Sequence, residues 1–174
     1  MTLQIVLHGA ESVGKSTLAM RLAAHFGAPL VPEYGREYCA THGTDLDEAG
    51  LTAIMHGHIA TTADALCGNP PLLIADTDPL MTAAWAMLLL GRRSAALDAF
   101  ANPGDLYLVA APDAPWVDDG LRMHAAPALR HRLHDLAMAE LHRRNVPYQM
   151  LAGDFAARES AAIAAIAAIT GNSA

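Results

Sequence analysis

The sequence has few of the features that mark secreted or membrane proteins. It contains only two cysteines, Cys39 and Cys67, so a disulfide framework is excluded and a reduced intracellular protein is expected. The most apolar run, residues 85–90, is too short to cross a bilayer. The amino terminus also lacks the charged segment and long apolar stretch of a signal peptide. We therefore expect a cytoplasmic protein that does not associate with membranes.

Positive charge is also scarce. Acidic residues outnumber basic residues by 18 to 11, and no run rich in lysine or arginine occurs, so the electrostatic footprint of a nucleic-acid-binding protein is missing. The 174 residues, 53% of them hydrophobic, suffice for one domain spanning 1–174 with a sizeable core. A small-molecule substrate is the expected partner, and the composition indicates no particular oligomeric state.

Short apolar segments alternate with longer amphipathic stretches along the chain. The short segments are rich in valine, isoleucine and leucine, and the stretches between them have the apolar spacing of helices. This alternation predicts an α/β fold in which a five-stranded parallel sheet carries helices on both faces. The predicted strands are residues 3–7, 29–31, 72–75, 106–110 and 146–151.

Helix boundaries are marked by characteristic residues. Gly27 and Gly91 each follow a helical pattern and are expected to end a helix, because glycine readily adopts the left-handed conformation found there. Asp45 and Glu48 have the spacing of a capping box and predict the start of another helix.

Residues 9–16 fit the phosphate-binding pattern G-x-x-x-x-G-K-[ST] and lie between a predicted strand and a predicted helix. In such a loop the backbone wraps the phosphates of a nucleotide, and the helix amino terminus adds positive potential. Lys15, the only lysine in the chain, is expected to reach the β- and γ-phosphates, and the Ser16 hydroxyl to ligate Mg²⁺. ATP and Mg²⁺ are therefore the predicted cofactors. The predicted ATP-binding residues of the loop are Gly9, Ala10, Glu11, Ser12, Val13, Gly14, Lys15, Ser16 and Thr17.

Three further segments give the sequence a specific resemblance. E-Y-G-R-E-Y follows the second predicted strand at residues 33–38, D-T-D follows the third at 76–78, and A-P-W-V-D-D-G-L-R follows the fourth at 114–122. Together with the phosphate loop, this order and spacing closely resembles the ribosylnicotinamide kinase domain of the bacterial NadR-type regulator of NAD synthesis. The resemblance runs from about Leu3 to about Arg158, nearly the whole chain.

The resemblance implies a P-loop NTPase fold like that of nucleoside and nucleotide kinases. It also implies ATP-dependent phosphorylation of the 5′-hydroxyl of nicotinamide riboside, which yields nicotinamide mononucleotide. Multifunctional members of the family place a DNA-binding domain and an adenylyltransferase domain before the kinase, and this chain starts two residues before its first predicted strand. We therefore expect a stand-alone kinase. Asp154, Phe155 and Arg158 resemble the family's adenine-side loop and are expected to bind ATP.

Carboxylates at strand ends are candidates for the metal site and for the catalytic base. Asp76 ends an apolar strand, where a Walker-B-like carboxylate holds Mg²⁺ together with Ser16; capping of the next helix is its alternative role. Glu33 follows the second strand and is the leading candidate to orient or deprotonate the acceptor hydroxyl, with Asp78 as the alternative base. A solvated glutamate at a helix entrance is the simpler interpretation of Glu33.

Residues 33–38 are also candidates for acceptor binding. At spacings of three and four residues, Arg36 and Glu37 can share one helical face with Glu33, where they bind the substrate or pair with each other. In the family a tryptophan precedes this motif and contacts the nicotinamide ring, whereas Pro32 stands here. Tyr34, Tyr38 or Trp116 are the candidates to supply the missing aromatic face. The predicted substrate-binding residues are Glu33, Tyr34, Arg36, Glu37, Asp78 and Trp116.

Residues 112–126 are predicted to form a lid between a strand and a helix. Arg122 is expected to reach the ATP phosphates as an arginine finger, which makes it the third catalytic candidate beside Lys15 and Glu33. An ordinary surface loop is the alternative. Trp116 is expected either to cover the substrate or to anchor the loop.

The nine histidines do not indicate a metal site, since no cysteine or carboxylate stands at ligand spacing to complete one. His56 and His58 are interpreted as solvated or core residues of a helix. Two other functions are weighed against the riboside kinase. One is a P-loop kinase of another small nucleoside or metabolite, and the other is a P-loop ATPase or nucleotide switch that regulates a partner protein.

Overall fold

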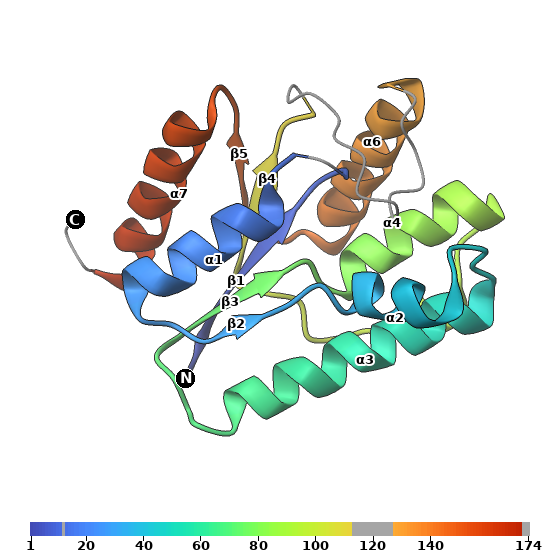
Figure 1. The fold of residues 1–174 in the computed structure, drawn as a ribbon, viewed down its shortest axis with the longest axis horizontal. Helices are drawn as coiled ribbons and strands as arrows, with labels where there is room; N and C mark the ends of the chain where they lie inside the picture. The colour runs from blue at the N-terminus through green and yellow to red at the C-terminus, as the bar shows by residue number, and fades with distance from the viewer. Residues whose placement is uncertain (12, 113–126, 172–174) are drawn as a thin grey trace.

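The computed structural model describes residues 1–11, 13–112 and 127–171 of the chain. Strands and helices alternate along most of this length (Figure 1). Of the predicted lid, only Pro112 lies within the described residues. The elements are β1 (Leu3–His8), α1 (Lys15–Phe26), β2 (Leu30–Val31), α2 (Tyr34–His42), α3 (Glu48–Leu66), β3 (Leu72–Asp76), α4 (Pro79–Leu90), α5 (Ala95–Asp98), β4 (Leu106–Ala110), α6 (Pro127–Arg144), β5 (Tyr148–Leu151) and α7 (Phe155–Thr170).

The strands form the predicted five-stranded parallel sheet, and their order in it is β2-β3-β1-β4-β5. β1 and β3 each run one residue further than expected, because His8 pairs with Val109 of β4 and Asp76 pairs with Leu7 of β1. β5 begins at Tyr148 and not at Val146, because the Val146 amide donates to the Leu141 carbonyl at 3.3 Å and so closes the end of α6. All carboxyl ends of the strands meet at one edge of the sheet, where ligands bind in open α/β folds.

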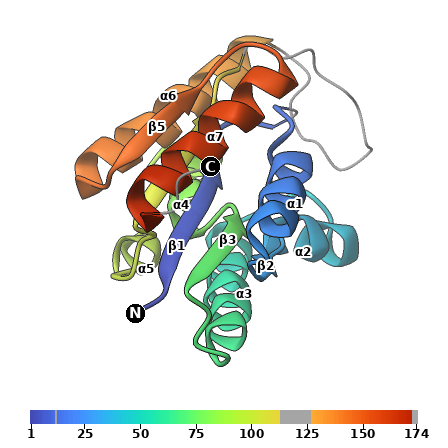
Figure 2. The same cartoon turned by 90° about the vertical axis from the view of Figure 1, so that its left-hand side faces the viewer.

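Each central strand is buried on both sides. In β1, Ile5 and Leu7 pack in one hydrophobic cluster with residues of α1 and α7, whereas Val6 packs in a second cluster with Leu80 of α4 and Leu141 of α6. Figures 1 and 2 show the corresponding layers, with α1 and α7 on one face of the sheet and α3, α4 and α6 on the other. This arrangement explains the nearly continuous apolar character of the strands.

The helix boundaries agree with the sequence at Gly27 and Gly91, which follow α1 and α4 with φ angles of 60° and 66°. The predicted capping box at Asp45 is wrong. Asp47 caps α3, because its Oδ1 accepts from the Gly50 amide at 2.8 Å, and Glu48 pairs with Arg92 at 2.5 Å and does not take part in the cap. Within the described residues, no helix combines the length and apolarity needed to cross a membrane.

Candidate active site

The phosphate loop joins β1 to α1 and depends on glycine at two positions. Gly9 has a φ of 117°, and a Cβ atom there would lie 2.7 Å from the Ala110 carbonyl oxygen at the end of β4. Gly14 has a φ of 82° and occupies the N-cap of α1. Since neither conformation suits another residue, these glycines fix the path of the loop. The Lys15 Nζ donates to the Ala10 carbonyl at 2.6 Å, so the ammonium group lies over the loop.

Arg158 of α7 links the loop to the carboxyl-terminal part of the chain. Its guanidinium is buried, and it donates to the carbonyls of Val13 at 2.9 Å, Gly153 at 2.9 Å and Ala111 at 3.3 Å. Burial lowers the pKa of this guanidinium from its usual value. Arg158 therefore holds three segments of main chain together around the phosphate loop.

The other two predicted adenine-side residues also lie near the loop. A Cβ at Gly14 would be 3.7 Å from the Phe155 ring, which carries Arg21 over its face at 5.4 Å from the centroid. Asp154 caps α7, where its Oδ1 accepts from the Ala157 amide at 2.8 Å. The structure thus brings Phe155 beside the phosphate loop and gives Asp154 a capping role.

Asp76, at the end of β3, lies next to the phosphate loop. Its side chain is buried, and its Oδ1 has no hydrogen-bond partner among the described residues. Burial, followed by the neighbouring Glu33 carboxylate, raises the pKa of Asp76, whereas Lys15 and a hydrogen bond with Ser16 act in the opposite direction. An unsatisfied carboxylate oxygen beside a serine hydroxyl is the kind of oxygen ligand set that Mg²⁺ prefers.

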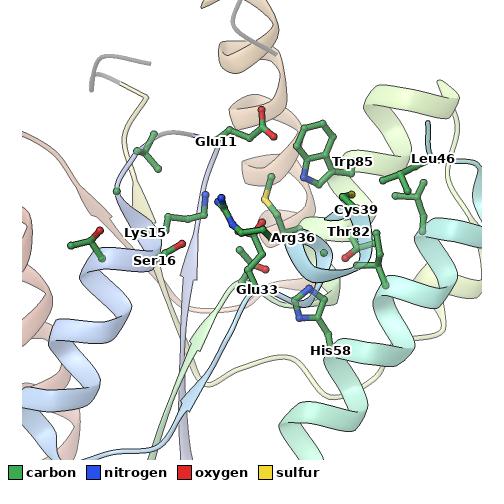
Figure 3. A pocket seen from close by; sticks show the side chains of 18 residues that line it. Glu11, Lys15, Ser16, Glu33, Arg36, Cys39, Leu46, His58, Thr82 and Trp85 are labelled. Atoms are coloured by element: carbon green, nitrogen blue, oxygen red, sulfur yellow. The ribbon is translucent and has the colours of Figure 1, made fainter. Parts of the chain in front are cut away.

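A cavity extends from the phosphate loop between α2, α3 and α4 (Figure 3). Its polar end lies at the loop, and its apolar walls come from the three helices. The lining residues are Glu11, Val13, Gly14, Lys15, Ser16 and Thr17 at the loop; Glu33, Gly35, Arg36 and Cys39 at α2; Leu46, Leu51, Ile54 and His58 at α3; and Thr77, Met81, Thr82 and Trp85 at α4.

Glu33 and Arg36 line the same cavity as Lys15, and Figure 3 shows their side chains beside that of Lys15. Glu33 is the N-cap residue of α2 but does not use its side chain to cap the helix. Instead its Oε2 accepts from Arg36 at 3.3 Å, and the carboxylate is 27% exposed. The two side chains therefore pair with each other and face the same space as the phosphate-binding lysine.

Other predicted substrate-binding residues lie elsewhere. Tyr34 packs so closely on α3 that a Cβ at Gly57 would come within 2.0 Å of its ring. Within the described residues, neither Tyr34, Glu37 nor Asp78 belongs to the cavity lining. Asp78 caps α4 and accepts a hydrogen bond from the Tyr107 hydroxyl. Burial raises the pKa of Asp78 to about 6. The predictions for Ser12, Trp116 and Arg122 concern positions outside the described residues.

Comparisons with known proteins place the chain in a family. A family model described as an AAA domain matches residues 4–158. The chain belongs to this AAA domain family. The trifunctional NAD biosynthesis/regulator protein NadR of Escherichia coli (strain K12) is 30% identical to this chain over 150 residues. NadR of Salmonella typhimurium has the same identity over the same length. The aligned part is 83% of this chain but only 37% of either relative.

Solved structures give the same result. A crystal structure of NadR in complex with NR matches 98% of this chain and 52% of that chain, with a TM-score of 0.81 and 26% identity. Deoxyadenosine kinase from M. mycoides matches 95% of this chain and 100% of its own, with a TM-score of 0.72 and 12% identity, which shows a shared fold. These findings confirm the resemblance to NadR and the P-loop, nucleoside-kinase-like fold.

Several residues of the cavity lining were not predicted from the sequence as site residues, and four of them are notable. Trp85, Thr82 and Cys39 project into the cavity, and His58 is a buried residue of its wall (Figure 3). Burial lowers the pKa of His58 to about 4, so its imidazole is neutral at neutral pH. The α4 residues had one usable signal, since Met81, Thr82 and Trp85 share a helical face directly after the strand that ends at Asp76. His58 had none, because its position depends on how α3 packs.

Proposed function

We propose that this protein transfers the γ-phosphate of Mg-ATP to the 5′-hydroxyl of nicotinamide riboside and thereby forms nicotinamide mononucleotide. The observation that carries the proposal is one cavity that joins Lys15 and Ser16 of the phosphate loop to the Glu33 carboxylate. The similarity to a NadR structure determined with NR supports the choice of acceptor.

The phosphate end fits a Mg²⁺ ion held by the Ser16 hydroxyl and the Asp76 carboxylate. Asp76 has a buried oxygen without a partner among the described residues, and Ser16 lies beside it. Mg²⁺ supplies charge neutralisation on the transferring phosphate. Lys15 adds a point charge on the β- and γ-phosphates, and the amino terminus of α1 adds its dipole.

Glu33 is the proposed base. It lines the same cavity as Lys15, so an acceptor hydroxyl bound in that cavity can lie near both the carboxylate and the γ-phosphate. Asp78, the alternative base, is disfavoured because its two oxygens accept from the Leu80 amide and the Tyr107 hydroxyl away from the cavity lining. Arg36 is proposed to orient Glu33 through their hydrogen bond.

The far end of the cavity suits a cationic aromatic ring. Trp85 of α4 stands there, away from Ser16 (Figure 3). The pyridinium of nicotinamide riboside is positively charged, and an indole face attracts such a cation. Tyr38 instead stacks on His42, with ring centroids 4.2 Å apart. Trp85 is therefore proposed to take the place of the aromatic residue that is missing at Pro32.

The test is an acceptor panel assayed with Mg-ATP. Nicotinamide riboside, neutral ribonucleosides and deoxynucleosides are compared by the rate of ADP formation and by mass spectrometry of the products. We expect the riboside to give the highest kcat/KM, with little ADP formed when no acceptor is added. A neutral nucleoside as the best acceptor would point to another nucleoside kinase. ADP formation that does not depend on any acceptor would point to an ATPase or nucleotide switch.

A further inference from the structure

Two buried carboxylates, Asp76 and Asp78, flank Thr77, and they differ in how far their oxygens are hydrogen-bonded. Asp76 has a buried oxygen, Oδ1, without a partner among the described residues, and its carboxylate lies beside Ser16 of the phosphate loop. Asp78 uses both of its oxygens: Oδ1 accepts from the Leu80 amide at 3.0 Å, and Oδ2 accepts from the Tyr107 hydroxyl. One carboxylate therefore lies beside the phosphate loop with an oxygen to spare, whereas its neighbour is fully hydrogen-bonded inside the protein.

Tyr107 connects the turn between β3 and α4 to β4, two strands away in the sheet. It is fully buried on β4, which is separated from β3 by β1. Its hydroxyl donates to Asp78 and accepts from the Gly104 amide at 3.1 Å. A Cβ at position 104 would lie 2.5 Å from the Val6 side chain, so a larger residue there would force a neighbour to move. The hydrogen bonds thus join the β3–α4 turn to the segment that leads into β4.

Thr77 needs such support. Its φ angle is 71°, in the left-handed region that β-branched residues rarely adopt and that persists only when the surroundings fix it. On one side, its amide donates to the Leu7 carbonyl of β1 at 3.1 Å. On the other side, the turn is held through the contacts of Asp78. Thr77 also lines the cavity, so a shift of this turn alters the site directly.

We propose that Asp78 and Tyr107 are positioning residues, which hold the strained Thr77 turn so that the Asp76 carboxylate points toward Ser16 and the phosphate loop. The inference rests on the metal site of the proposed function. It gives Asp78 a role other than that of base, and it accounts for a buried carboxylate and phenol that phosphate transfer itself does not use.

The experiment measures metal binding without catalysis. Mn²⁺, a spectroscopic substitute for Mg²⁺, is titrated into the protein with saturating ADP and followed by electron paramagnetic resonance, while ADP binding without metal is measured by calorimetry. We expect Tyr107→Phe and Asp78→Asn each to weaken Mn²⁺ binding about tenfold, the effect usual for groups that orient metal ligands. Metal-free ADP binding stays within about twofold. Because Tyr107→Phe removes, and Asp78→Asn weakens, the same hydrogen bond, the double variant binds Mn²⁺ about as well as Tyr107→Phe alone.

Tyr148→Phe is the matched control. Tyr148 is the register partner of Tyr107 on β5, and its hydroxyl bonds only to the exposed His142 among the described residues, at 3.1 Å. The control is expected to bind Mn²⁺ like the unchanged protein.

Three outcomes overturn the proposal. Unchanged Mn²⁺ affinity in Tyr107→Phe and Asp78→Asn, even with a lower melting temperature, makes the pair merely structural. Loss of metal-free ADP binding, or of the fold, shows that the pair supports more than the turn. Additive losses in the double variant show that the two residues act separately. Failure of the metal site itself is distinguishable, since Asp76→Asn then retains the Mn²⁺ affinity of the unchanged protein.

Discussion

The two ends of the cavity are built in different ways. The centre of the nucleotide end is one contiguous segment, in which Gly9 and Gly14 set the backbone. Arg158 joins this segment to two others through the carbonyls of Val13, Gly153 and Ala111. The acceptor end is assembled from side chains of α2, α3 and α4, which lie far apart in the sequence. Backbone conformation determines the geometry of the nucleotide end, and the packing of the three helices determines that of the acceptor end.

This difference separates general function from specificity. A site made by backbone geometry holds phosphates whatever the acceptor is, whereas a site made by side chains on three helices can change its ligand through single substitutions. Changes at the nucleotide end should therefore affect all acceptors alike. Changes at the acceptor end should affect acceptors differently.

The largest effect is expected for Lys15→Ala. Its ammonium group is proposed to act on the transferring phosphate and not on the hydrophobic core, so turnover should fall by about 10³-fold for every acceptor while the protein stays folded. Steady-state kinetics with several acceptors and a circular dichroism spectrum provide the check. Near-normal turnover with any acceptor would contradict the role given to the phosphate loop.

Glu33→Gln should lower kcat by about 10²-fold or more, because the amide cannot accept the proton of the acceptor hydroxyl. ATP binding, measured by calorimetry, should change little. Glu48→Gln is the control, since Glu48 pairs with Arg92 outside the cavity. Equal losses in the two variants would remove Glu33 from the mechanism.

Arg158→Ala should destabilise the nucleotide end. It removes the hydrogen bonds that Arg158 donates to the carbonyls of Val13, Gly153 and Ala111, which costs about 3 kcal/mol of unfolding free energy. Urea denaturation measures this loss, and the KM for ATP should rise while the relative preference among acceptors stays the same. A changed acceptor preference would break the separation between the two ends.

The smallest effect is expected for Trp85→Ala. Loss of a cation–π contact worth about 0.5 to 2 kcal/mol should raise the KM for nicotinamide riboside roughly threefold to thirtyfold. Trp85→Phe should recover part of this loss. The KM for a neutral nucleoside should rise less, because it carries no cation. An equal rise for charged and neutral acceptors would mean that Trp85 only shapes the cavity.

The fold was predictable because its signals are local. The apolar strands, the glycines after α1 and α4, and the residue spacing of the phosphate loop each lie within a few neighbouring positions. The exceptions were small and also local, as when Asp47 and not Asp45 proved to be the residue that caps α3.

The acceptor end was predictable only in part. Glu33 and Arg36 follow a strand directly and were recognised, whereas His58 and Trp85 enter the cavity because of how α3 and α4 pack. Asp78 shows the same limit. Its place in the D-T-D segment suggested a base, but its oxygens are taken by Tyr107 of a strand two positions away in the sheet and by the Leu80 amide. Hydrogen bonds of this kind depend on tertiary structure and have no signature in a single sequence.

The central claim is that both ends act together in one phosphate transfer from ATP to nicotinamide riboside. It is tested most directly by incubating the protein with Mg-ATP and the riboside, and by quantifying ADP and nicotinamide mononucleotide in the same samples by mass spectrometry. The account predicts that the two products appear in equal amounts and that both are lost in Lys15→Ala. ADP without nicotinamide mononucleotide would contradict it.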